Sequence, residues 1–261
     1  MNEKINKLIK LSLINKNNKD FPYLKISNDD KYSGWVSNFN LTRLSDNFQI
    51  KLNLKNEKDL FLLFVLASSW SKNTRWENAV YFVVSLILTD DFKIKDWHSP
   101  EFVNKHIEYR QESCQSVLNK VYGFQSRIKI SFKKDFYPSV KVLSDNWETI
   151  KMKLEESDKK QDWEIFINYI SSVEGLGTGK KKMRIKIPLI LRELRCQNIY
   201  NIDGKYCCVA DKRVRDTYKN YINKKLPSNY LKASEVIWND FKELYDIPAF
   251  AYTDFLERNL I

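Results

Sequence analysis

Two long apolar segments constrain the fold of this chain more than any other feature. Residues 57–70 (EKDLFLLFVLASSW) and 74–88 (TRWENAVYFVVSLIL) are apolar on almost every side of a helix. Both exceed the length of a typical strand, and a helix that is apolar all round is buried inside a larger core. We therefore expect two core helices within a mainly α fold. The sparse turn-forming content, six Gly and six Pro in 261 residues, favours the same class.

Weaker patterns surround these core segments. The first 56 residues are polar and carry short alternating pieces at 34–36 and 48–52, which predict a small N-terminal cap that is irregular or contains short strands. The remainder, 57–261, is expected to form one helical domain. Further amphipathic helices are predicted at 99–122, 140–154 and 162–173.

The charge balance points to an anionic partner. The chain has a formal net charge of +11 and a pI near 9.3. Lysines and arginines that neutralise phosphates release condensed counterions, which gives affinity for nucleic acid without sequence preference. The alternative is an ordinary solvated surface in a chain rich in Lys and Asn.

Metal-ligand and membrane patterns are both missing from the sequence. The four cysteines lack CxxC spacing, and the two histidines lack the motif of a zinc deaminase; these residues are Cys114, Cys196, Cys207, Cys208, His98 and His106. We expect no metal and no cofactor. No signal-like start and no run of about 18 apolar residues occurs, so we expect an intracellular protein, cytoplasmic or nucleoid-associated, without a membrane partner.

Half of the glycines fall within five residues. Gly175, Gly177 and Gly179 lie between two predicted helices, in a region spanning about 171–195. Such a turn lets backbone N–H groups approach a phosphate closely. The densest basic stretch follows, with Glu193 as its single acid: Lys180, Lys181, Lys182, Arg184, Lys186, Arg192 and Arg195. A glycine C-cap before a solvated helix is the alternative, whereas a P-loop is disfavoured because GK[ST] is absent.

The order of motifs resembles that of the helix-hairpin-helix DNA glycosylases, most closely their archaeal 8-oxoguanine glycosylase branch. The resemblance runs from about residue 60 to the C-terminus, while the first 56 residues have no counterpart. It is carried by LFVLASSW with RWENAVYFV, YGFQSRIK, KKKMRIKIPLIL, CCVADKRVRDTY and EVIWNDFKELYDIPAFAYTDFL. It implies a two-lobed helical fold and a monomeric base excision repair enzyme. Its substrate would be double-stranded DNA with a damaged base, an oxidised purine such as 8-oxoguanine.

The resemblance also implies a catalytic pair. In the family, a lysine early in the helix after the hairpin is the nucleophile, and an aspartate about thirty residues later is its partner. Asp211, in VADKRV, matches that aspartate, although Ala210 stands where the family usually has Val. The register of apolar positions favours Lys181 as the nucleophile, with Lys182 and Lys180 as alternatives.

The chemistry of such a pair is consistent with these residue types. A lysine amine attacks as the neutral base, and crowding by neighbouring cations disfavours its charged form. Attack on sugar C1′ expels the base and leaves a Schiff base, from which β-elimination nicks the strand. An anionic Asp211 would stabilise the cationic sugar and position the amine. The alternative is that Asp211 only caps a helix beginning near Lys212, and the two roles are compatible.

A damaged base outside the duplex needs an aromatic face and hydrogen-bonding groups. Trp76 resembles the tryptophan that stacks on the base, and a core tryptophan is the alternative. Asp254 resembles a pocket acid, but the spacing before it is one residue longer than in the family. Glu257 or Arg258 replaces the second pocket tryptophan, which leaves the identity of the base open. Arg127 is a candidate contact to the DNA backbone, with solvated surface as its alternative.

Two other classes of protein compete with a glycosylase. A helix-hairpin-helix protein could bind DNA without chemistry, because a fold does not imply a function. A metal-dependent nuclease is the second, from the DDFKIK stretch at 90–95. That reading is disfavoured because no partner acid-x-Lys motif occurs.

Overall fold

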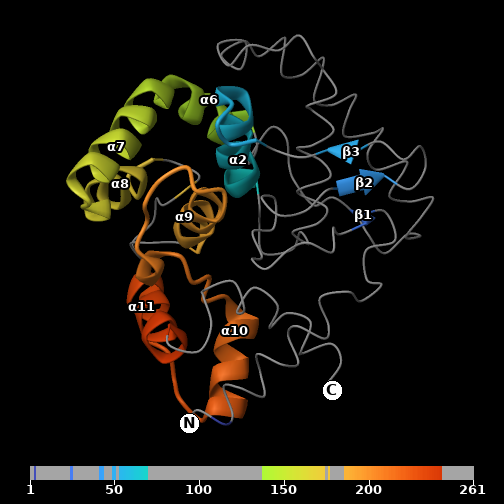
Figure 1. The fold of residues 1–261 in the computed structure, drawn as a ribbon, viewed down its shortest axis with the longest axis vertical. Helices are drawn as coiled ribbons and strands as arrows, with labels where there is room; N and C mark the ends of the chain where they lie inside the picture. Colours follow the sequence, from blue (N-terminus) through green and yellow to red (C-terminus); the bar gives the residue numbers. More distant parts are fainter. Residues whose placement is uncertain are drawn as a thin grey trace. The chain divides into compact units, whose positions relative to one another are not determined.

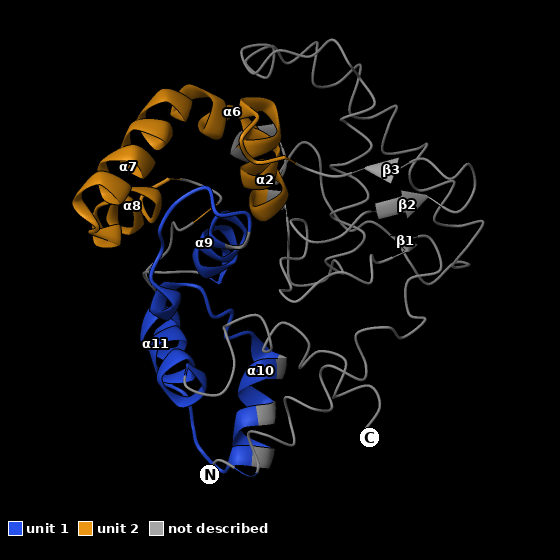
Figure 2. Cartoon of the chain, viewed as in Figure 1, with its two compact units in different colours: residues 1–51, 179–261 blue, residues 52–178 orange. Residues whose placement is uncertain are grey.

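The computed structural model describes residues 3, 24–25, 41–43, 49–50, 53–69, 137–173, 176 and 185–242. The described part is mainly helical, which confirms the expected class (Figure 1). The chain divides into two compact units (Figure 2). Unit 1 comprises 1–51 and 179–261, and unit 2 comprises 52–178. The expected cap at 1–56 and helical domain at 57–261 stay predictions.

The first predicted core helix is α2, Glu57–Ser69, in unit 2. It begins after Asn56, whose side-chain oxygen accepts a hydrogen bond from the N–H of Lys58 at 2.9 Å. Every residue from Leu60 to Ala67 is buried, so the helix is enclosed on all sides as its composition predicted. The predicted helices at 74–88 and 99–122 lie outside the described residues.

The predicted helix at 140–154 is two helices, α6 (Tyr137–Asp145) and α7 (Trp147–Lys160). The break is at Asn146, whose side-chain nitrogen donates to the carbonyl of Val142 at 2.8 Å. Its side-chain oxygen accepts from the hydroxyl of Tyr169 at 3.1 Å. Asparagine competes with the backbone for hydrogen bonds in this way, which is why it interrupts helices.

A tight turn joins α7 to α8, Trp163–Ile170. Gln161 ends α7 in the left-handed conformation, with φ of 52°, and its N–H donates to the carbonyl of Asp158 at 3.1 Å. Asp162 then caps α8 by accepting from the N–H of Glu164 at 3.1 Å. The buried hydroxyl of Ser157 also accepts from the N–H of Phe166 at 3.0 Å. The two helices therefore form an antiparallel hairpin.

Aromatic rings fill the space between α2, α7 and α8. The ring of Trp147 meets Phe61 and Phe64 edge to face, with centroid separations of 5.0 and 5.5 Å. Phe166 continues the cluster at 6.3 Å from Phe64 and 6.4 Å from Trp163. Such pairs add about 0.5–1.5 kcal/mol each beyond the area they bury. This cluster is the core of the described part of unit 2.

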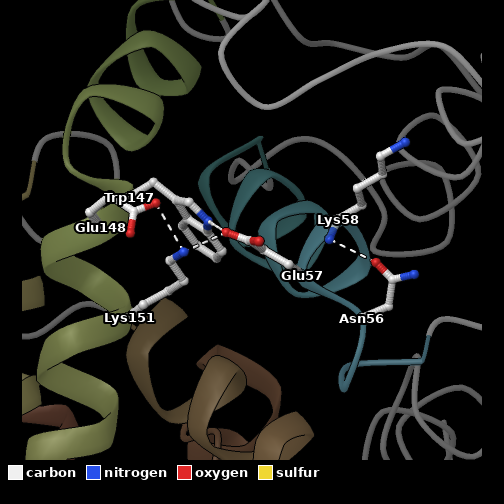
Figure 3. A network of polar contacts seen from close by, with 6 residues as sticks. All are labelled: Asn56, Glu57, Lys58, Trp147, Glu148 and Lys151. Atoms are coloured by element: carbon white, nitrogen blue, oxygen red, sulfur yellow. Dashed lines mark hydrogen bonds and ion pairs between the residues drawn. The ribbon is translucent and has the colours of Figure 1, made fainter.

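A polar network ties the start of α2 to α7 (Figure 3). Glu57 accepts a hydrogen bond from the indole nitrogen of Trp147 at 3.0 Å and pairs with Lys151. Lys151 also pairs with Glu148 at 2.9 Å. The hydrogen bonds from Lys151 and Trp147 hold the pKa of Glu57 below its ordinary value.

The described N-terminal residues of unit 1 form a small antiparallel sheet in the order β1 (Leu24–Lys25), β2 (Leu41–Arg43), β3 (Gln49–Ile50). Leu24 pairs with Arg43, and Thr42 pairs with Gln49. Strand β3 falls inside the alternating piece at 48–52. The piece at 34–36 lies outside the described residues.

The described residues 185–242 of unit 1 are mainly helical. They contain α9 (Lys186–Cys196), the short 3-10 helix η5 (Gly204–Tyr206), α10 (Lys212–Thr217), the π-helix η6 (Tyr218–Ile222) and α11 (Tyr230–Phe241). Helix η5 packs against both α9 and α11. Residues Ile187 to Leu194 of α9 are all buried, including Arg192 and Glu193, which pair at 3.0 Å. The charge of Arg192 is therefore balanced in the interior.

Candidate functional site

The predicted aspartate lies at the start of α10. Asp211 has an extended backbone, and its side chain accepts a hydrogen bond from the N–H of Val214 at 2.8 Å. Its carbonyl also accepts the first helical bond, from the N–H of Arg215 at 3.0 Å. Asp211 is therefore the N-cap of this helix, as its position before Lys212 predicted. The side chain is half-buried.

The residues before Asp211 are anchored to α11. The N–H of Cys208 donates to the hydroxyl of Ser234 at 2.8 Å, and both groups are buried. Ala210 is fully buried. A buried N–H without an acceptor is costly, so this hydrogen bond fixes the distance between the turn and α11. We refer to residues 208–212 as the Asp211 turn.

Arg215 closes the Asp211 turn from the other side. Its Nε donates to the carbonyl of Ala210 at 2.9 Å, and its NH1 donates to the carbonyl of Pro227. The guanidinium lies over the ring of Tyr230, with 4.8 Å between Cζ and the ring centroid. A planar, stacked guanidinium with two fixed hydrogen bonds holds the adjacent backbone in one position. We call Arg215 and Tyr230 the Arg215 clamp.

A second network supports the far end of the same helical segment. The fully buried Tyr218 donates its hydroxyl to Oδ2 of Asp240 at 3.2 Å, and Lys224 pairs with the same carboxylate at 2.8 Å. Burial is the largest cause that raises the pKa of Tyr218 well above its ordinary value, followed by the charge of Asp240. The hydroxyl therefore stays a hydrogen-bond donor. This network ties η6 to the C-terminal end of α11.

Most of the predicted site residues lie outside the described residues: Lys180, Lys181, Lys182, Gly175, Gly177, Gly179, Trp76, Arg127 and Asp254. Between residues 174 and 184, which include the three glycines and the three lysines, Leu176 is the residue that the structure describes, as a buried turn residue. The described part of α9 begins at Lys186, five residues after Lys181. The pairing of Lys181 with Asp211 therefore stays a prediction, as do the base-binding and backbone-binding roles.

The structure adds residues that the sequence analysis did not single out. Arg215 follows Asp211 by four residues, a spacing at which side chains of a helix are neighbours. This spacing is a sequence signal that could have identified Arg215. Ser234 and Tyr230 come from α11, and they reach Cys208 and Arg215 respectively only through the tertiary fold. No local pattern could have identified them.

Charge is distributed unevenly between the described parts of the two units. Residues 185–242 of unit 1 contain twelve Lys and Arg against six Asp and Glu, a net charge of +6. Residues 53–69 and 137–173 of unit 2 contain seven against nine, a net charge of −2. The basic character of the described chain is thus concentrated in the unit that contains Asp211.

Within the described residues, no group of three or more His, Cys, Asp or Glu side chains could hold a metal ion. None of the described helices is both long and apolar enough to cross a membrane. Comparison with protein-family models, with curated proteins and with solved structures gave no match.

Proposed function

We propose that this chain is a bifunctional DNA glycosylase and abasic-site lyase that removes an oxidised purine from double-stranded DNA. The observation that carries the proposal is the construction of the Asp211 turn. Its carboxylate is fixed by the N–H of Val214, and its backbone is fixed by Ser234 and Arg215. A catalytic carboxylate needs such support, because a displacement of about 1 Å can cost orders of magnitude in rate.

The proposed reaction uses Lys181 as the nucleophile. The neutral amine attacks C1′ of the damaged nucleotide, the glycosidic bond breaks, and the base leaves with its bonding electrons and takes up a proton. Asp211 stabilises the positive charge that develops on the sugar. The attached amine then loses a proton and the C1′–O4′ bond opens, with O4′ taking up a proton, which gives a protonated Schiff base. Loss of a proton from C2′ of this Schiff base expels the 3′ phosphate and nicks the strand. Hydrolysis of the Schiff base then restores the lysine.

The proposal includes the architecture that the motifs imply. We propose a two-lobed helix-hairpin-helix fold, with the hairpin at Gly175 to Gly179 and the adjacent Lys180 holding the DNA backbone together with Arg127. Trp76 and Asp254 would receive the extruded base. The enzyme would act as an intracellular monomer without a cofactor.

The positive charge of residues 185–242 supports a nucleic-acid partner but serves binding and catalysis equally well. It is therefore also the observation that supports the second candidate, a DNA-binding protein without chemistry. The two functions differ in one product, because only the amine mechanism forms a Schiff base that borohydride reduces to a stable covalent complex.

The test is borohydride trapping with the full-length chain on duplexes that each contain one defined lesion. The panel comprises 8-oxoguanine, uracil, an abasic site and undamaged DNA. A trapped complex together with strand cleavage at an oxidised purine is the expected result. If the protein binds all four duplexes without any trapped complex or cleavage, the glycosylase function is wrong and DNA binding without chemistry is supported.

A further inference from the structure

The helical segment formed by α10 and η6 keeps one side buried over its whole length. Val214, Tyr218 and Ile222 are buried, and each is four residues after the one before. Four residues exceed one α-helical turn of 3.6, so a regular helix would rotate the last of them away from the first. The wider turn of the π-helix from Tyr218 onward offsets this rotation. The segment therefore keeps one constant buried side and one constant exposed side.

The exposed side is polar and basic. Lys212, Lys219 and Asn220 are exposed, and the half-buried Asp216 has the same phase, four residues after Lys212 and four before Asn220. Among the described residues, the side chains of Lys212 and Lys219 form no ion pair or hydrogen bond. We call Lys212, Asp216, Lys219 and Asn220 the α10 face; α10 is labelled in Figure 1.

Several lysines of unit 2 are instead paired with acids. Four of them form ion pairs with acids at 2.5–2.9 Å: Lys141, Lys151, Lys153 and Lys160. On the α10 face, by contrast, neither lysine side chain forms an ion pair within the described chain. Exposed cations without internal partners are available to an external anion.

We propose that the α10 face contacts the phosphate backbone of duplex DNA, in addition to the hairpin. The proposal rests on the proposed function, because it takes the same DNA as partner. Lysine and asparagine side chains are common donors to phosphate oxygens. Lys212 and Lys219 are separated by seven residues, about 10 Å along the helix axis, so they can contact separate phosphates. These contacts give affinity without reading sequence.

The composition of the α10 face selects duplex DNA over other polyanions. A platform for single-stranded nucleic acid needs exposed aromatic rings on which bases stack, and none of the four residues that define the α10 face is aromatic. A membrane-surface helix needs exposed apolar residues. The exposed large hydrophobic residue found in the described chain is Met152, which belongs to α7 in unit 2.

The test measures the affinity of the full-length protein for an undamaged duplex across a salt series. Lys212→Gln and Lys219→Gln should each weaken binding about 3- to 8-fold near 0.1 M salt and reduce the slope of log affinity against log salt by about 0.9. The matched control is Lys159→Gln, an exposed lysine of α7 whose loss changes the net charge equally. It should leave both quantities unchanged.

Asp216→Asn should change the DNA affinity in the direction opposite to the lysine variants. Removal of this acid from the α10 face should tighten binding and steepen the salt dependence, which damage to the fold would not do. If the two lysine variants keep the wild-type slope, or behave like Lys159→Gln, the proposal is wrong. The proposal is also wrong if the protein binds phosphatidylserine vesicles, and the lysine variants lose this vesicle binding while their DNA affinity is unchanged.

Binding to undamaged duplex and borohydride trapping separate this proposal from the proposed function. If the wild-type protein is trapped but the variants keep the wild-type salt slope, the DNA contact of the α10 face is wrong and the lyase activity stands. If the salt slopes change but no complex is trapped, the DNA contact of the α10 face is supported and the lyase activity is wrong.

Discussion

The guanidinium of Arg215 lies over the ring of Tyr230, at 4.8 Å from its centroid, while its Nε donates to the carbonyl that immediately precedes Asp211. The position of the candidate catalytic carboxylate therefore depends on a side chain that follows it by one helical turn. This relationship makes the Arg215 clamp a positioning device, and it predicts that catalysis and stability respond differently to its loss.

Arg215→Lys is expected to lower the free energy of unfolding by about 1–3 kcal/mol, because lysine cannot make both hydrogen bonds and stack on Tyr230. The trapping rate should fall by more than tenfold under conditions where the variant is fully folded. Arg195→Lys is the matched control, since Arg195 also stacks on an aromatic ring of α11, that of Trp238, with 5.2 Å between Cζ and the ring centroid. An Arg215→Lys protein that is destabilised but traps at the wild-type rate would contradict the positioning role.

Asp211→Asn separates the cap from the catalyst. Asparagine caps helices about as well as aspartate, so the free energy of unfolding should fall by less than about 1 kcal/mol. Trapping should fall by orders of magnitude, because the neutral amide cannot stabilise a cationic sugar. Asp211→Ala, which loses both roles, should cost about 1 kcal/mol more in stability than Asp211→Asn. Parallel losses of stability and activity across the two variants would favour a cap without a catalytic role.

The Glu57 network predicts a dependence of stability on pH. The pKa of Glu57 is lowered in the folded state from an ordinary value of 4.5, so the folded protein binds fewer protons there than the unfolded chain. Its contribution is present above about pH 4.5 and is lost as the pH falls through the lower folded pKa. Glu57 is partly exposed, so the contribution at neutral pH is below about 1 kcal/mol.

Glu57→Gln keeps an acceptor for Trp147 and removes only the charge. The difference in unfolding free energy between wild type and this variant should therefore shrink between pH 6 and pH 3, as followed by urea denaturation. Glu148→Gln, which removes the more exposed of the two carboxylates that pair with Lys151, is the matched control. A difference for Glu57→Gln that is constant with pH would show that its charge contributes nothing.

The sequence patterns predicted the helices better than their junctions. The apolar run at Leu60 to Ala67 predicted a fully buried helix, and the cap at Asp211 was readable because aspartate before a charged helical run is a common start. The break at Asn146 was not predicted, since it depends on the hydroxyl of Tyr169 from another helix. The π-helix at Tyr218 follows from a four-residue spacing of buried side chains that 3.6-residue periodicity does not anticipate.

The residues of the candidate site also differ in how far the sequence predicts them. The position of Asp211 was found from a local motif, whereas its supports, Ser234 and Tyr230, lie nineteen or more residues away in sequence and meet it through packing. Basic residues looked alike in the sequence, yet Arg192 is buried in an ion pair while Lys212 and Lys219 are exposed. Only tertiary structure distinguishes a structural cation from an available one.

In the proposed mechanism, a lysine of the 180–182 stretch and Asp211 form a Schiff-base site. The most direct measurement compares borohydride trapping of wild type, Lys181→Gln and Lys182→Gln on a duplex containing 8-oxoguanine, with binding to undamaged duplex measured in parallel. Lys181→Gln should abolish trapping while binding changes by no more than a few-fold, and Lys182→Gln should still trap. Loss of trapping only in Lys182→Gln would move the nucleophile by one residue. Trapping that survives in both variants and in Lys180→Gln, or that never occurs in the wild-type protein, would contradict the account.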